Sequence, residues 1–147
     1  MKIFEANYDG VDILDDKLIL NCVFPEDFNL KKSLLMNWYL NKATEILHER
    51  FDHYTEIYEQ NDVELSVKKL TKRWGEFHLS KNLVVLNAEL VVAPMECIDY
   101  VIIHELCHAL ILDHSPNFYK LLLKRLPTWK HLKNSLEAHS IGFGPIV

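Results

Sequence analysis

Residues 101–114 read VIIHELCHALILDH and place three histidines, His104, His108 and His114, around one glutamate, Glu105. Positions four apart on a helix project from the same face, so the first two imidazoles can bind a single ion. Glu105 lies one step round the helix, close enough to contact a water on that ion. If the helix simply continued, His114 would lie about 240° further round than His108. The chain must therefore turn before His114 to bring the third ring back.

This set of side chains predicts a catalytic zinc site. Three imidazole nitrogens leave one coordination position open, whereas a structural zinc site is closed by a fourth protein ligand. The segment is strongly apolar, and a histidine or glutamate buried there without a partner is costly, so a metal is the expected partner. Cys107 projects about 100° away from His108 on an ideal helix, which favours a core thiol. We expect Zn²⁺ on His104, His108 and His114, with Glu105 as the catalytic base.

Length and composition indicate a small cytoplasmic enzyme. The 147 residues suffice for one domain, residues 1–147, that buries a sizeable core. A formal net charge of −5 argues against nucleic acid as the main partner. The cysteines at 22, 97 and 107 are odd in number and widely spaced, as is typical of reduced thiols. No apolar run reaches transmembrane length, and the first ten residues lack the apolar region of a signal peptide.

Hydrophobic periodicity predicts an α+β fold. We expect turns at 9–10 and 15–16, strands at 2–7 and 17–23, a long helix at 30–58, antiparallel strands at 63–70, 73–79 and 83–87, and helices at 95–112, 116–125 and 128–139. Ser115 and Pro116 are typical of a helix start. The segment 83–90 is expected to be the sheet edge beside the metal-binding helix, where an extended peptide could pair.

Several spaced elements outside the histidine motif are also distinctive. They are Arg73-Trp74-Gly75, Leu86-Asn87, Ile98-Asp99-Tyr100-Val101, and His114-Ser115 followed by Phe118-Tyr119. In these elements the chain resembles the YgjP-like metallopeptidases, small zincins akin to the SprT-like proteases, over about residues 30 to 136. The resemblance implies a single-domain minimal zincin with a long N-terminal helix, a small antiparallel-rich sheet, the HExxH helix and C-terminal helices. It implies protein or peptide substrates, and it carries the ligand and base roles to the same four residues.

The sequence departs from the family pattern in the strand that follows Arg73-Trp74-Gly75. Glu76-Phe77 stands where the family usually has Ser-Cys, and a carboxylate there either changes the substrate cleft or is simply a solvated strand residue. The donor that stabilises the oxyanion stays open among Tyr100, Tyr119, Arg73 and Asn87. Candidates for orienting a ligand's second ring nitrogen are Asp99, Asp113 and Glu137.

Two other functions compete with a peptidase. YbeY-type endoribonucleases present histidines at the same spacing and end in Asp-His, as Asp113-His114 does, but they generally lack a glutamate after the first histidine. Glu105 therefore favours the peptidase. The basic runs at 68–73 and 120–133 keep a phosphoester substrate in consideration, since metal-activated water also attacks phosphoesters. The third possibility is an inactive metal-binding interaction module. The sequence says nothing about oligomeric state.

Overall fold

The structure, a computed structural model, describes residues 2–5, 8–15, 17–23 and 26–139. The chain forms two compact units, Met1–Lys42 and Ala43–Val147, and helix α1 (Phe28–Ile57) runs from the first unit into the second. No helix among the described residues is long and apolar enough to cross a bilayer. The last two positions of the strand expected at 2–7 lie outside the described residues.

The N-terminal unit contains a three-stranded sheet. Its strands are β1 (Lys2–Glu5), β2 (Gly10–Leu14) and β3 (Lys17–Cys22), in the order β1-β3-β2. β3 pairs in parallel with β1 and antiparallel with β2. Strand β2 is missing from the sequence prediction, because Asp9-Gly10 resembles a turn. The turn expected at 15–16 does follow β2, where Asp15 has a φ of 49°, a left-handed conformation that aspartate tolerates; residue 16 lies outside the described residues.

The second unit contains a separate mixed sheet. Its strands are β4 (Glu64–Lys68), β5 (Gly75–His78) and β6 (Leu83–Asn87), in the order β4-β6-β5. β5 pairs antiparallel with β6 as predicted, but β4 pairs with β6 in parallel. The prediction that 83–90 forms the sheet edge is wrong, because β6 is the central strand and its residues from Val84 to Leu86 are fully buried. The edge strand beside the helix that carries the histidine motif is β5.

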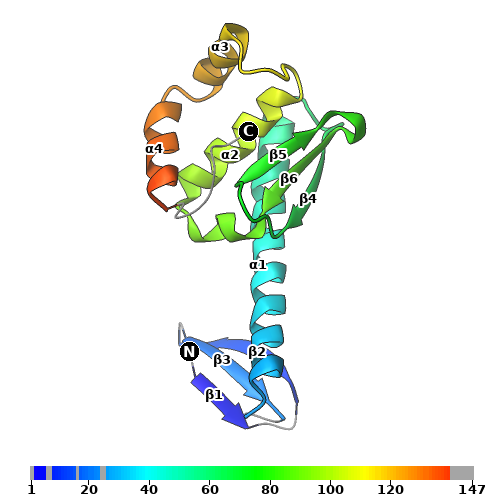
Figure 1. Cartoon of the computed structure of the whole chain (residues 1–147), viewed down its shortest axis with the longest axis vertical. Helices are drawn as coiled ribbons and strands as arrows, with labels where there is room; N and C mark the ends of the chain where they lie inside the picture. Colours follow the sequence, from blue (N-terminus) through cyan, green and yellow to red (C-terminus); the bar gives the residue numbers. More distant parts are fainter. Residues whose placement is uncertain (1, 6–7, 16, 24–25, 140–147) are drawn as a thin grey trace. The chain divides into compact units, whose positions relative to one another are not determined.

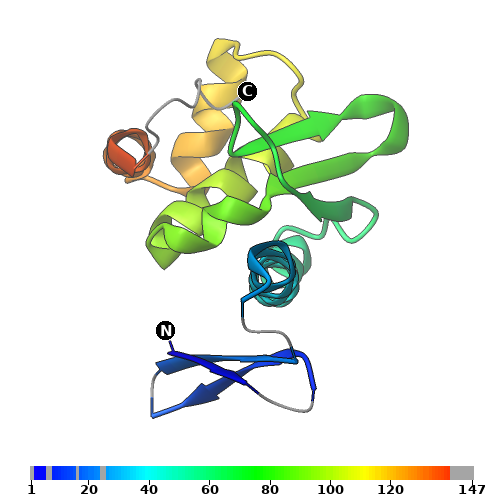
Figure 2. The same cartoon turned by 60° about the horizontal axis from the view of Figure 1, so that its bottom comes forward.

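Helix α2 (Met95–His108) carries the histidine motif and lies between this sheet and helix α4 (Trp129–His139) (Figures 1 and 2). Helix α3 (Pro116–Arg125) also packs against α2. Because neighbours cover nearly every side of α2, its residues from Cys97 to His108 are buried, with the exception of Asp99, which is half-buried. The core around it includes residues from α1, β6, α3 and α4, among them Leu47, Phe51, Leu86, Phe118, Leu122, Leu132 and Leu136.

Two polar contacts fix α2 against its neighbours. The Arg50 guanidinium donates to both carboxylate oxygens of Asp99, over 2.8 and 2.7 Å. On the other side, the Gln60 amide donates to the Leu106 carbonyl over 2.9 Å, and Arg125 donates to the Gln60 side-chain oxygen over 2.8 Å. These bonds hold α2 in one position. They also occupy Asp99, which is therefore no longer a candidate for orienting a histidine ligand.

Candidate metal centre

The three histidines of the motif converge on one point. The Nε2 atoms of His104 and His108 are 3.2 Å apart, those of His108 and His114 are 3.1 Å apart, and those of His104 and His114 are 3.5 Å apart. Bonds of about 2.0–2.1 Å to a tetrahedral zinc ion would place neighbouring nitrogens about 3.3–3.4 Å from one another. The triangle of nitrogens therefore has the size of one face of a tetrahedral metal site.

The end of α2 explains how the third histidine reaches the other two. The helix ends at His108 and not near Leu112 as predicted. The amides of Leu110 and Ile111 still bond to the Cys107 carbonyl, over 3.0 and 2.8 Å, and beyond Ile111 no backbone bond among the described residues continues the helix. The turn expected before His114 is therefore present, and it is reached earlier along the chain. Its reversal also brings the carbonyl oxygen of Ile111 to 3.1 Å from Nδ1 of His108.

That carbonyl determines the tautomer of His108. A carbonyl only accepts, so Nδ1–H of His108 donates to Ile111 and the lone pair of Nε2 faces the other two rings. Burial lowers the pKa of His104 to about 3 and lowers the pKa of His108, and neighbouring imidazoles act in the same direction. Neutral rings with converging lone pairs are what a metal requires.

Phe118 is the residue that packs against all three rings. It is fully buried, and its ring stacks on His108 with centroids 4.4 Å apart. The centroids of His104 and His114 lie 5.0 and 5.1 Å away. In the sequence, Phe118 stands out only as part of the family resemblance, with no role assigned to it. The sequence feature that could have identified Phe118 is its position in the first turn of α3, directly after the loop that carries His114.

Glu105 is completely buried, and neither oxygen of its carboxylate has a hydrogen-bond partner among the described residues. Burial raises the pKa of Glu105 well above its ordinary value, with Glu76 acting in the same direction and Arg73 in the opposite one. Nδ1 of His104 is likewise buried without a partner. Unpaired polar atoms are costly in a core. Because Glu105 directly follows His104 in the chain, its unpaired oxygens fit a site built for an ion and its water.

Comparison with known proteins agrees with this geometry. Residues 2–139 match the YgjP-like metallopeptidase domain. The chain belongs to the YgjP-like family. A search of curated proteins gave no match.

Solved structures similar to this member of the family include two metallopeptidase zymogens. Abylysin of Pyrococcus abyssi is 19% identical with a TM-score of 0.61, and the match covers 69% of this chain and 99% of that one. Jannalysin of Methanocaldococcus jannaschii is 18% identical with a TM-score of 0.58, covering 65% of this chain and 97% of that one. These likenesses concern the fold, and they confirm the α+β class expected from the sequence.

In this YgjP-like chain, the glycine of Arg73-Trp74-Gly75 lets β5 lie directly on α2. A Cβ atom at Gly75 would lie 3.0 Å from Cγ1 of Val101, 3.3 Å from Cγ of Glu105 and 3.3 Å from Cδ2 of Leu86. These contacts are tighter than a packed core accepts. Gly75 therefore allows the edge strand to approach the carboxylate-bearing side of the helix.

We expect Gly75→Ala to destabilise the fold by about 1–3 kcal/mol, because one added methyl group overpacks this junction. Denaturant unfolding of the metal-loaded protein measures the change. Peptidase turnover should fall as well, since Glu105 is one of the groups that must shift. Unchanged stability together with unchanged turnover would show that β5 and α2 have room to separate.

An open cavity of about 420 Å³ adjoins the histidines. One wall comes from the end of α2 and the loop after it, and the other from β5 and its flanking residues. The lining residues are His108, Leu112 and His114 on the first wall and Arg73, Glu76, Phe77, His78 and Ser80 on the second. Glu105 is not among them, because it lies buried beneath β5. A ligand in this cavity would contact two of the three histidines and the edge strand together.

The structure narrows the choice of oxyanion donor. The side-chain amide of Asn87 donates to the carbonyls of Leu70 and Arg73 over 3.0 and 2.8 Å, so it holds the loop before β5. Tyr100 is 1% exposed and packs edge-on against the His104 ring. Both residues therefore have structural positions. Of the four candidates, Arg73 lines the cavity, and Tyr119 is partly exposed and stacks on His114.

Proposed function

We propose that this chain is a zinc-dependent metallopeptidase in which His104, His108 and His114 hold the ion and Glu105 is the catalytic base. The observation that carries the proposal is the triangle of Nε2 atoms next to a buried carboxylate without a partner. Membership of a metallopeptidase family supports it. When bound, a zinc ion acts as a Lewis acid that acidifies a water and polarises a carbonyl group.

The protein's own residues would supply the proton transfers and the geometry. An Oε atom of Glu105 accepts the water's proton and later passes it to the leaving amine, so the carboxylate ends the cycle ionised as it began. Its position favours this role, because the carboxylate follows His104 directly and neither of its oxygens is engaged by another described residue. His108 keeps its orientation through the Ile111 carbonyl, and Phe118 holds all three rings from beneath.

The substrate would bind as an extended peptide along β5. Among the described strands, β5 pairs only with β6, so its other side presents backbone N–H and C=O groups. These groups can pair with a peptide by main-chain hydrogen bonds. Because β5 also lines the cavity opposite His108 and His114, a peptide bound there would pass the metal site. The sequence predicts the same kind of main-chain pairing, but with β6. The structure makes β5 the edge strand, so β5 takes that role.

The direct test is metal analysis of protein purified without added metal, followed by hydrolysis assays on unfolded protein and on RNA. We expect about one zinc per chain and cleavage of the protein substrate alone. Cleavage of RNA would favour the phosphoester hydrolase, and a zinc-loaded protein inactive on both would favour the binding module.

A cytoplasmic location also stays a prediction, supported by the buried free thiols of Cys97 and Cys107.

Removal of the metal should lower the thermal midpoint by at least several degrees. An ion at a thousand times its Kd adds about 4 kcal/mol, and each 1 kcal/mol is worth about 2–4 °C at this size. The protein should still fold, because α2 makes its own apolar contacts on all sides. Thermal unfolding before and after chelation, with zinc added back as the control, measures the shift. An identical midpoint for verified metal-free protein would show that metal binding does not stabilise the fold.

A further inference from the structure

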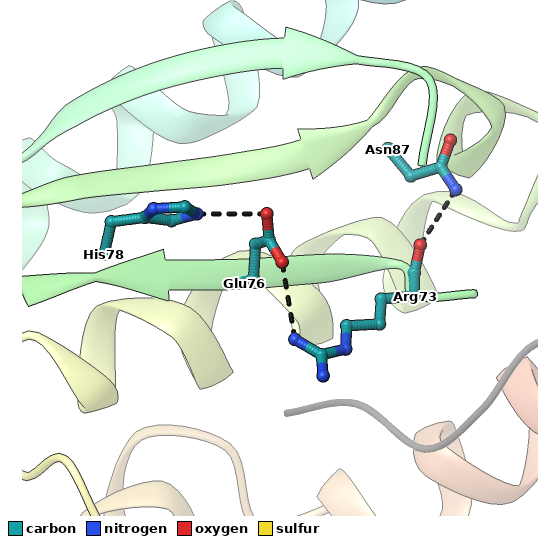
Figure 3. Close-up of polar contacts among 4 residues, drawn as sticks. All are labelled: Arg73, Glu76, His78 and Asn87. Carbon is teal, nitrogen blue, oxygen red and sulfur yellow. Dashed lines mark hydrogen bonds and ion pairs between the residues drawn. The ribbon is translucent and has the colours of Figure 1, made fainter. Parts of the chain in front are cut away.

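Three polar side chains on the β5 wall of the cavity form a connected group that the proposed chemistry does not use. Nε2 of His78 lies 3.0 Å from Oε1 of Glu76, and Nη1 of Arg73 lies 3.4 Å from Oε2 of the same carboxylate (Figure 3). Glu76 and His78 are two positions apart on one strand, so they share a face. We call Arg73, Glu76 and His78 the β5 triad.

Within the triad, the guanidinium of Arg73 has donors to spare. Arginine offers five N–H groups, and among the described residues this guanidinium bonds only to Glu76. The Arg73 side chain is 47% exposed, against 24% for Glu76. Glu76, in contrast, has both oxygens engaged. The triad therefore presents a cation with open donors to the cavity, while its carboxylate is already paired.

The net charge of the cavity with a metal ion bound also favours a ligand that carries a carboxylate. Glu76 is the sole carboxylate among the lining residues described for the cavity, and Arg73 balances it. Imidazole ligands add no charge, and the carboxylate of Glu105 offsets only one of the two charges of a divalent ion. The cavity therefore carries net positive charge when loaded, which attracts anions and disfavours cationic side chains. A planar guanidinium with spare donors matches a carboxylate in shape as well as in charge.

We propose that Arg73 is a substrate-binding residue that selects peptides carrying a carboxylate near the scissile bond, and that Glu76 and His78 hold its guanidinium in place. This specificity rests on the peptidase function proposed above. The carboxylate comes from an acidic side chain or from the free C-terminus of the peptide, and Arg73 recognises the same chemistry in either case. The Glu76 substitution noted in the sequence thereby gains a role, since it anchors the cation.

The test compares paired peptides on one preparation of metal-loaded protein. Each pair differs by Glu against Gln beside the cleaved bond, or by a free against an amidated C-terminus. We expect the wild type to prefer the carboxylate-bearing member of one pair type by about 10- to 100-fold in kcat/KM, expressed mainly in KM. The pair type that shows the preference identifies the source of the carboxylate. Because the ratio compares two peptides on the same sample, any partly unfolded fraction cancels.

Arg73→Gln should reduce this preference to within about two-fold, and Arg73→Lys should keep part of it. Lys72→Gln is the matched control, since it removes the same charge one position away and should leave the preference intact. Glu76→Gln should weaken the preference by loosening the guanidinium. Binding of the same peptides to metal-loaded Glu105→Gln protein gives a second readout that needs no turnover, and Arg73→Gln should abolish its carboxylate preference too.

Three results would overturn the assignment. The first is a wild type without the preference. The second is an Arg73→Gln variant that keeps the preference in full. The third is an Arg73→Gln variant that slows both members of a pair equally in kcat. The last result would place Arg73 at the reacting carbonyl, as an oxyanion donor. Failure of the peptidase function looks different, because no peptide of either kind would then be cleaved by the metal-loaded wild type.

Discussion

Glu105→Gln is expected to keep the metal and to lose hydrolysis by about 10²–10⁴-fold, the range that a positioned general base typically contributes. Glutamine preserves the size of a side chain that is completely buried. It also retains an oxygen and a nitrogen that can contact a water, but it cannot accept the proton. The loss should fall on kcat, because the substitution leaves the cavity lining unchanged.

Zinc content and the thermal midpoint must be measured on the same Glu105→Gln sample, since loss of metal would also stop hydrolysis. We expect the midpoint of the variant to match or exceed that of the wild type, because the substitution removes a buried carboxylate that lacks a partner. A fully loaded variant that retains more than about a tenth of wild-type turnover would show that another group is the base. The ribonuclease-type mechanism, which works without this carboxylate, would then move ahead of the peptidase.

The second large effect is expected for His114→Ala, which should reduce bound zinc from about one per chain to a small fraction. Two imidazoles four apart on a helix hold an ion less tightly than three at tetrahedral spacing, and the third nitrogen lies 3.1 and 3.5 Å from the other two. His114 is exposed at the cavity rim. Its removal therefore tests the metal site with little disturbance of the core. Elemental analysis of protein purified without added metal gives the occupancy.

His78→Ala is the matched control for the metal measurement. His78 lines the same cavity, but it bonds to Glu76 and is not part of the converging group. This variant should keep its zinc. If His114→Ala remained fully loaded, the third ligand would lie elsewhere, and His131, Glu137 and His139 of α4 would be the next to replace.

The sequence predicts the motif-bearing part of the molecule well, because the signals there are local. Residues 104 and 108 share a helix face whatever surrounds them, and the rotation of a helix requires a turn before His114. Pro116 after Ser115 likewise marks the start of α3, which begins at Pro116. The end of α2 was harder to place. Leu110 to Leu112 continue its apolar pattern, and only the hydrogen bond between His108 and the Ile111 carbonyl shows why the chain reverses there.

Strand pairing could not be predicted in the same way. The alternation of apolar and polar residues identifies β4 as a strand. It does not predict that β4 pairs in parallel with β6 or that β5 is the edge strand. The fully apolar run Leu83–Leu86 did carry a usable signal, since continuous hydrophobicity is typical of a strand buried on both faces. The roles of Phe118 and the β5 triad depend on contacts between distant segments. No local pattern reveals them.

The two walls of the cavity come from stretches of chain that are separate in the sequence. Residues 73–80 form one wall, and the other comes from the segment that also carries the metal-binding side chains. Mutation can therefore change the first wall without moving any of the three histidines. The second segment has no such freedom, because the helix end, the loop and Phe118 together set the spacing of the rings. Divergence among related chains should accordingly accumulate around β5, so that new substrate preferences evolve on an unchanged catalytic apparatus.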